Sequence, residues 1–307
     1  ALPLARCITR LSSSFVPGRQ EDPAEFLVVL LDHLVQCLSS THSSLDTNNL
    51  SSPIRIIFGI IMKSSTKCTQ CQSETSKQHY ESVWSVPIIS CSTLEQALHA
   101  FCAVERLSND DMLFCSNCQT KVIGLKSTQL SHASPVIFIQ YKRFIHDNHA
   151  KVIRKLSQFI SYPETLGMSP FVTSEVVDSS HEDNKSNEYV YKLNAVVVHI
   201  GETANSGHIF SYIRSPDNFW YKADDELVRK CDLDMILADN NSYILCYTKT
   251  SGRNLALQET ECVQSSTETS RGPHSSTPIF HDRTNLKSSD YEKTVSLNST
   301  PILFMLV

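Results

Sequence analysis

The sequence predicts an α+β fold, with helices near the start of the chain and a β-rich body after them. A capped apolar stretch at residues 20–37 has helical periodicity, whereas four short segments between residues 191 and 249 are rich in β-branched and aromatic residues. From residue 251 the chain is rich in Ser and Thr and has no sustained period. We therefore predict a folded domain over residues 1–250 and a disordered tail over residues 251–307.

The first helix is expected in the stretch RQEDPAEFLVVLLDHLVQCL. Asp22 can cap its first turn, Pro23 suits the first helical position, and Glu25 follows three residues after the cap. Helical spacing then places one set of side chains on a single face: Phe26, Val29, Leu30, Leu34 and Cys37.

The next segments are expected to form strands and one further helix. IRIIFGIIMKSSTKC reads as a strand hairpin that leads to Cys68, and SVWSVPII reads as another strand. A capping box formed by Ser92 and Glu95 predicts a helix in STLEQALHAF.

The second half of the domain is predicted to be mainly β. SPVIFIQYKRF has the β-branched and aromatic residues of a buried strand. YKLNAVVVHI, HIFSYIRS, NFWYKA and SYILCYTK are expected as four strands of an antiparallel sheet. The polar stretch over residues 172–188 is expected to be a mobile insertion.

Composition limits the choice of partner and compartment. A net charge of −5 and a pI of about 6.2 argue weakly against a nucleic-acid partner, because phosphate binding favours a basic surface. The sequence contains no run of eighteen apolar residues, so no membrane span is expected. The first residues of the chain lack the apolar core of a secretory signal. The 11 cysteines then favour a reducing compartment, cytoplasmic or nuclear, and metal thiolates over disulfides.

Two C-x-x-C pairs carry the strongest chemical signal. KCTQC contains Cys68 and Cys71, and FCSNC contains Cys115 and Cys118. Four thiolates can hold Zn²⁺ tetrahedrally, and such a closed site supports the fold without an open position for catalysis. The alternative is four buried or free thiols.

A single histidine in SGHIFSYI is the candidate general base. Gly207 allows another backbone to approach His208 closely. WYKADDELV follows, and neighbouring antiparallel strands could place Asp224 beside the His208 ring, with Asp225 next to it. A carboxylate on one ring nitrogen leaves the other free as a base. Spacing alone also allows a turn histidine near surface acids, and His199 is expected to be a satisfied strand residue.

Seven of these motifs, in this order, resemble the catalytic domain of the ubiquitin-specific proteases, the ubiquitin carboxyl-terminal hydrolase family of peptidases. They are GRQEDPAEFLVVLLD, KCTQC, FCSNC, SPVIFIQYKRF, YKLNAVVVHIGETANSGHIFSYIR, WYKADDELV and SYILCY. The resemblance implies a papain-like cysteine-protease hand. In it the residue 20–37 helix belongs to the thumb, the zinc knuckles to the finger tip, and the His208 sheet to the palm.

The resemblance also implies the activity, which is hydrolysis of the isopeptide or peptide bond after the C-terminal glycine of ubiquitin. His208 would be the catalytic base, Asp224 the third triad member and Asp225 a polar helper. The expected partners are ubiquitin and ubiquitinated proteins, with structural Zn²⁺ and with no nucleic acid or membrane.

The nucleophile is where the sequence departs from the family. The family carries it in a Gly-Asn-Thr-Cys-Tyr box well before the QEDPAEFL motif, and the sequence has no such box. Cys7 precedes that motif, but it lies too close and its neighbours do not match, so it is expected to be a buried helix cysteine. Ala24 and Ile209 also stand where the family often has a histidine and an aromatic residue.

Two functions remain open on this basis. One is a thiol-dependent deubiquitinase whose nucleophile lies upstream of Ala1, and the other is a catalytically inactive ubiquitin-binding scaffold. The presence of both SGH and ADD favours the enzyme. A zinc-ribbon nucleic-acid binder fits the cysteine pairs but not the acidic charge or the strand pattern.

Overall fold

The computed structural model describes residues 8–16, 18–39, 52–147, 151–173, 189–203 and 206–250. Cys7, most of the predicted insertion and the predicted tail at 251–307 lie outside these residues. In the described part, no helix combines the length and apolar character needed to cross a membrane.

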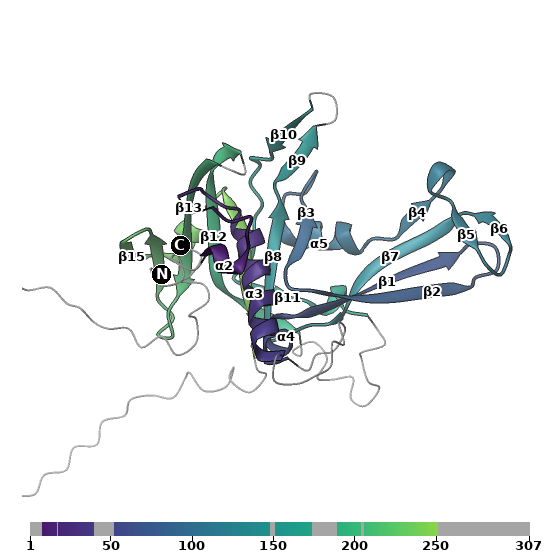
Figure 1. The fold of residues 1–307 in the computed structure, drawn as a ribbon, viewed down its shortest axis with the longest axis horizontal. Coiled ribbons are helices and arrows are strands. Elements are labelled where there is room, and N and C mark those ends of the chain that lie inside the picture. Colours follow the sequence, from purple (N-terminus) through teal and green to yellow (C-terminus); the bar gives the residue numbers. More distant parts are fainter. Residues whose placement is uncertain are drawn as a thin grey trace, which may run out of the picture.

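A large mixed sheet forms the centre of the molecule, in the order β15-β14-β13-β12-β16-β8-β3, with β11 also paired to β12 (Figure 1). All of its pairs are antiparallel except β3 with β8. Its strands are β3 (Trp84–Pro87), β8 (Val136–Lys142), β11 (Thr165–Gly167), β12 (Val190–Thr203), β13 (Ser206–Arg214), β14 (Trp220–Asp224), β15 (Leu227–Cys231) and β16 (Ser242–Lys249). The predicted α+β class and the antiparallel pairing of the four late strands are confirmed.

The centre of this sheet is buried on both faces. Ala195 and Val197 of β12 belong to one apolar cluster, whereas Val196 and Val198 belong to another. Alternate residues of a strand point to opposite faces, so an uninterrupted apolar run is expected where both faces are covered. This explains the AVVV sequence, which shows no polar alternation.

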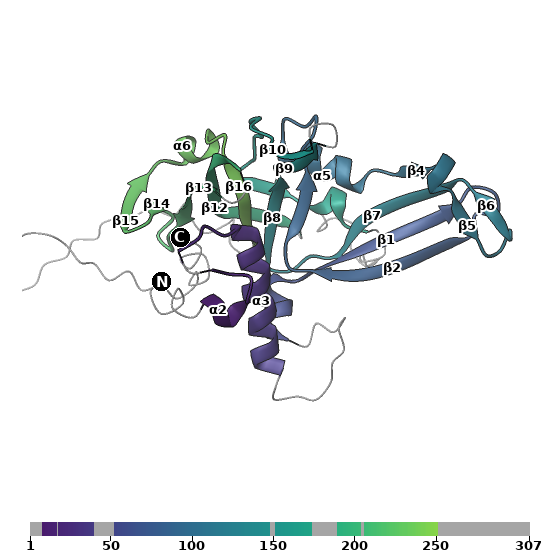
Figure 2. The ribbon, with the colours of Figure 1, turned by 45° about the horizontal axis from the view of Figure 1, so that its top comes forward.

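Helices α2 (Ile8–Leu11), α3 (Pro23–Ser39) and α4 (Pro53–Phe58) lie beside this sheet (Figure 1 and Figure 2). The predicted cap of α3 is confirmed, because Asp22 Oδ1 accepts hydrogen bonds from the Ala24 and Glu25 amides at 2.8 and 3.0 Å. The buried apolar positions of α3 are Ala24, Phe26, Leu27, Leu30, Leu31 and Val35. Cys37, which the helical spacing places on the same face as Phe26 and Leu30, is exposed.

The segment before β1 (Ile60–Cys68) is α4 rather than the first arm of a hairpin. Pro53 occupies the start of this helix, and the Gly59 amide donates to the Arg55 carbonyl at its end. Ile54 and Phe58, four residues apart, pack on the same cluster as α3. The β-branched composition misled the strand prediction, while the spacing of four was the helical signal.

A second sheet, here called the finger sheet, extends away from the body in the order β2-β1-β7-β4 (Figure 1). Its other strands are β2 (Glu74–Glu81), β4 (Glu105–Leu107) and β7 (Gly124–His132). The short hairpin β5 (Leu113–Cys115) and β6 (Thr120–Val122) lies at its far end. A separate hairpin is formed by β9 (Phe144–Asp147) and β10 (Val152–Lys155).

Helix α5 (Leu94–Cys102) begins one residue later than its capping box predicts. Thr93 is the cap, and its Oγ1 accepts a hydrogen bond from the Gln96 amide at 3.1 Å. The Ser92 amide and hydroxyl instead donate to the Gln96 side chain, at 2.9 and 3.0 Å. Thr93 therefore takes the capping role predicted for Ser92, whereas the Gln96 side chain accepts from Ser92 and not from the Thr93 amide that a full capping box would use.

Two late elements were not predicted. β15 pairs with β14 through a two-residue turn and is exposed along most of its length. Helix α6 (Leu233–Leu237) has only five residues, which is too short to give a periodic signal.

Candidate active site

His208 and Asp224 lie side by side at one end of the central sheet. Ser211 of β13 is paired with Ala223 of β14, so the start of β13 lies beside the end of β14. The His208 Nε2 and Asp224 Oδ1 atoms are 2.5 Å apart, and the His208 side chain is 46% exposed. Within the described residues Nδ1 makes no hydrogen bond, so the second ring nitrogen remains available. The predicted juxtaposition is therefore present.

Asp224 is an ionised partner for the imidazole. Its pKa is lowered, first by a hydrogen bond from Lys222 and then by the bond to His208. Asp225 follows in the turn to β15 with a φ of 52°, a left-handed conformation that Asp tolerates better than most residues. Ligand atoms of His208, Asp224 and Asp225 all lie within 4.8 Å of one another. The predicted trio thus forms one polar cluster.

No cysteine belongs to this cluster in the described part of the chain. Cys231, on the neighbouring strand, pairs with Trp220 at the opposite end of β14 from Asp224. Cys7 lies outside the described residues, so its predicted burial stays a prediction.

Gly207 sets the backbone that carries His208. Its φ is +154°, and a Cβ there would lie 2.1 Å from the Ile200 carbonyl oxygen and 3.0 Å from His199 Nε2. The opposing Gly201, at φ +144°, would place a Cβ 2.6 Å from the Ser206 carbonyl oxygen. The two strands approach at a register shift between Ile200 and Thr203, and this approach requires both glycines.

We expect Gly207→Ala to lower the free energy of unfolding by about 1–3 kcal/mol or more, because the added methyl meets backbone rather than a flexible side chain. Urea denaturation measures the loss. Gly167→Ala in β11 is the matched control, because nothing lies within 4 Å of its Cβ, and it should change stability by less than about 0.5 kcal/mol. Equal stability of the two variants would contradict the proposed close approach.

His199 is buried in β12, but its expected hydrogen bonding is absent. Within the described residues neither ring nitrogen has a hydrogen-bond partner, and the ring packs edge-on against Phe144, with Tyr243 also adjacent. Burial lowers its pKa, and the nearby Lys155 lowers it further. A neutral, aromatic-packed His199 therefore supports the core.

A polar chain connects α3 to the central sheet. The Tyr243 hydroxyl donates to Asp22 Oδ2 at 2.6 Å, and Gln140 donates to the same hydroxyl at 2.7 Å. Ser85 in turn donates to Gln140 at 2.6 Å. Asp22 thus caps the helix with one oxygen and joins it to β16 with the other.

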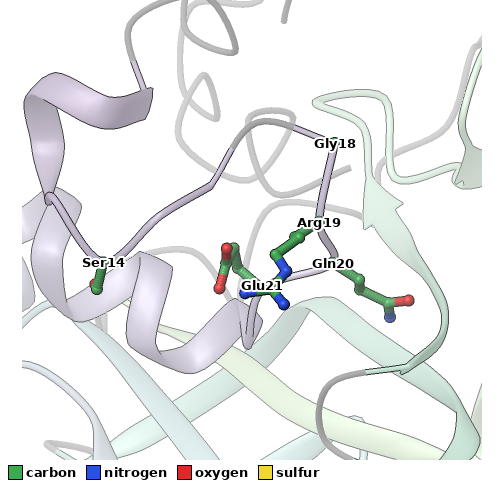
Figure 3. Close-up of a pocket in the computed structure, with 5 residues that line it drawn as sticks. All are labelled: Ser14, Gly18, Arg19, Gln20 and Glu21. Carbon is green, nitrogen blue, oxygen red and sulfur yellow. The ribbon is translucent and has the colours of Figure 1, made fainter.

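A cavity of about 410 Å³ opens beside the segment before α3 (Figure 3). It is lined by Ser14, Gly18, Arg19, Gln20 and Glu21. The Glu21 carboxylate accepts a hydrogen bond from the Val16 amide at 2.9 Å, which shapes the loop. Neither His208 nor Asp224 lines the cavity, so it is not the site of the proposed chemistry.

The four predicted metal ligands meet at the far end of the finger sheet. Cys68 ends β1, Cys71 follows in the next turn, and Cys115 and Cys118 lie on the β5–β6 hairpin. All four sulfurs lie within 4.8 Å of one another, and all four thiols are free. Cys68 is 3.9 Å from Cys118, and Cys71 is 3.6 Å from Cys115.

These sulfur positions fit a tetrahedral zinc ion. Four sulfurs at about 2.3 Å from one metal are separated by about 3.8 Å, close to the two separations given above. Amides of Gln70 and Cys71 point to the Cys68 sulfur at 3.4 and 3.5 Å. The pKa of Cys71 is lowered to about 5, first by a hydrogen bond from the Ser73 hydroxyl, whereas the pKa of Cys118 is raised to about 12, first by its hydrogen bond with Cys71. A metal ion would therefore displace a proton from this cluster when it binds.

Comparison with known proteins identifies the same family that the motifs indicate. The family model described as ubiquitin carboxyl-terminal hydrolase matches residues 2–247. The chain is 34% identical over 242 residues to ubiquitin carboxyl-terminal hydrolase 17-like protein C of Mus musculus, covering 78% of this chain and 42% of that protein. It is 33% identical over 245 residues to ubiquitin carboxyl-terminal hydrolase 21 of Arabidopsis thaliana, covering 79% and 32%. The chain therefore spans less than half the length of these relatives.

A solved structure has the same fold. The SAGA Ubp8/Sgf11/Sus1/Sgf73 DUB module bound to ubiquitin aldehyde contains a chain that superimposes with a TM-score of 0.70 at 23% identity. The match covers 81% of this chain and 54% of that one. The expected hand, with helices, palm sheet and extended fingers, is thus confirmed as a fold. The chain belongs to the ubiquitin carboxyl-terminal hydrolase family.

Proposed function

We propose that the protein is a deubiquitinase that hydrolyses the peptide or isopeptide bond after the C-terminal glycine of ubiquitin by thiol chemistry. The contact between His208 and Asp224 carries the proposal, because it leaves one ring nitrogen free to act as a base. Family membership and the likeness to a DUB module bound to ubiquitin aldehyde support ubiquitin and ubiquitinated proteins as partners.

The chemistry requires a cysteine thiol beside Nδ1 of His208. The imidazole takes the thiol proton, and the thiolate attacks the glycine carbonyl carbon to form a tetrahedral intermediate. The imidazolium gives its proton to the departing amine as the C–N bond breaks and a thioester remains. Water then attacks the thioester with His208 again as base, which releases the ubiquitin carboxylate and restores the thiol. Asp224 orients the ring and stabilises the imidazolium, with Asp225 beside it.

The nucleophile is proposed to precede Ala1 in the complete protein. The observation behind this is that no described cysteine joins the His208 cluster, while Cys7 lacks the sequence context of the family's cysteine box. The same observation favours the second candidate, a ubiquitin-binding scaffold without activity.

The cysteine cluster is proposed as a structural Zn²⁺ site held by Cys68, Cys71, Cys115 and Cys118. When bound, the ion would neutralise the thiolates and cross-link β1 to the β5–β6 hairpin. We further propose that the protein acts in the cytoplasm or nucleus, where these thiols stay reduced.

A fluorogenic ubiquitin C-terminal amide tests the function. We expect turnover by the protein extended through its natural upstream residues and none by the 307-residue chain. Binding of ubiquitin by both, without turnover by either, would favour the scaffold. Turnover by the 307-residue chain that Cys7→Ala abolishes would overturn the upstream assignment.

A further inference from the structure

Lys222 holds the oxygen of Asp224 that His208 leaves unused. The Lys222 ammonium lies 2.8 Å from Asp224 Oδ2, whereas the His208 Nε2 atom lies 2.5 Å from Oδ1. The carboxylate is therefore held between a cation and an imidazole, with one oxygen for each. None of the sequence motifs assigned a role to this lysine.

The lysine is itself fixed by an aromatic ring. Its Nζ lies 3.8 Å from the centroid of the Phe210 ring, close enough for a cation–π contact. Phe210 follows His208 by two residues on β13, and Asp224 follows Lys222 by two residues on β14. Residues two apart share one face of a strand, so the four side chains form one surface. The Lys222 side chain is only 32% exposed.

A carboxylate held at one oxygen is poorly oriented. Its terminal torsion is broad and roughly two-fold, so a single hydrogen bond leaves the plane free to swing. The Asp224 side chain is 26% exposed, and water competes for the second oxygen. An ammonium at that oxygen replaces the competing water and restricts the swing. The lowered pKa of Asp224, with Lys222 as its first cause, agrees with this contact.

We propose that Lys222 is a positioning residue for catalysis, which orients the Asp224 carboxylate so that it holds the His208 ring in place. The inference rests on the proposed function, because it assigns Lys222 to the same site. Lys222 does not contact the reacting atoms in this scheme, and it acts only through Asp224.

The first test uses the 307-residue chain and needs no turnover. Nitrogen-15 shifts of the His208 ring report how strictly the ring proton is held on Nε2. We expect Lys222→Met and Asp224→Ala to mix the two tautomers, and Lys222→Arg to keep the wild-type shifts. Lys230→Met is the matched control, because Lys230 also lies over an aromatic ring, 3.5 Å from the Phe219 centroid, and has no ion pair with a carboxylate among the described residues. Wild-type shifts in Lys222→Met would overturn the proposal.

The second test uses turnover of the fluorogenic ubiquitin amide by the protein that carries its upstream residues. Lys222→Met should lower kcat about tenfold or more with KM unchanged, because misplacing a catalytic group by a fraction of an ångström slows the chemical step. Lys222→Arg should recover most of kcat, and Lys230→Met should match wild type. A change in KM alone would refute positioning. If His208→Ala and Asp224→Asn also left kcat unchanged, the proposed function itself would be wrong, which is a distinct outcome.

Discussion

His208→Ala should lower kcat for a ubiquitin C-terminal amide by about 10²–10⁴-fold in the protein that carries its upstream residues. The substitution removes the group proposed to accept the thiol proton and to return it to the leaving amine. It leaves KM nearly unchanged, because the ring is a small part of the surface that a folded substrate such as ubiquitin would cover. Stopped-flow or plate-based fluorescence measures both constants.

Asp224→Asn should lower kcat by a similar factor, although it changes the partner of His208 and not the ring itself. An asparagine amide can donate to Nε2, which moves the ring proton to Nδ1 and turns the base into a donor toward the thiol. Combining the two substitutions should cost little more than His208→Ala alone, because the pair acts as one unit. Fully additive losses would contradict the shared role.

His79→Ala is the control for both variants. This histidine lies on β2 of the finger sheet with its side chain 47% exposed and 3.7 Å from Glu81. Its removal should leave kcat unchanged. A fall in kcat as large as that of His208→Ala would mean that the losses report general damage to the fold and not a missing base.

The ionisation of Asp224 adds a pH dependence of known sign. Its pKa is lower in the folded chain than in a model carboxyl, where it is about 3.9. The ion pair with Lys222 and the hydrogen bond from His208 therefore stabilise the folded chain fully above a pH of about 4, and this stability is lost as the pH falls through the lowered pKa of Asp224. Protonation of Asp224 thus does not limit activity near neutral pH.

Local chemistry made much of this fold predictable. The cap at Asp22 follows from the local preference for an acidic residue before a helix, and the strand at residues 195–198 follows from its β-branched composition. In both places the tertiary packing agrees with the local preference. The α4 segment failed because its isoleucines suit a strand as well as a helix, and packing against α3 and β8 decided between them. One such contact joins α4 to β8: the Phe58 ring stacks on the Phe138 ring, with 5.7 Å between the ring centroids.

The site could be predicted only in part. The juxtaposition of His208 and Asp224 could be predicted, because a hairpin register brings the end of one strand beside the start of another. Lys222 was missed, because its distance to a particular carboxylate oxygen depends on rotamers and on the Phe210 ring across the pair. Likewise, the unpartnered nitrogens of His199 could not be seen in a sequence, since they depend on the side chains that surround the ring.

The second large effect is expected at the finger tip, the far end of the finger sheet that holds the four cysteines. There Cys115→Ser should abolish zinc binding. Metal analysis of the purified 307-residue chain should find about one zinc per wild-type chain and almost none in the variant. Cys91→Ser is the control, because Cys91 is a partly buried thiol outside the cluster and should leave the zinc content unchanged.

Loss of the metal should open the finger tip while the central sheet stays folded. The tip has little apolar core of its own: Val122 and Leu113 are the main side chains there besides the four cysteines. Structural zinc sites contribute about 10–16 kcal/mol of binding free energy in small domains, far more than two aliphatic side chains can supply by burial.

Hydrogen exchange should therefore accelerate by orders of magnitude at β5 and β6, after chelation or in Cys115→Ser. The amides of β12 and β16 should remain protected, because their apolar clusters contain none of the four ligands. Protection of β5 and β6 that survives complete zinc removal would show that protein contacts alone hold the four sulfurs together.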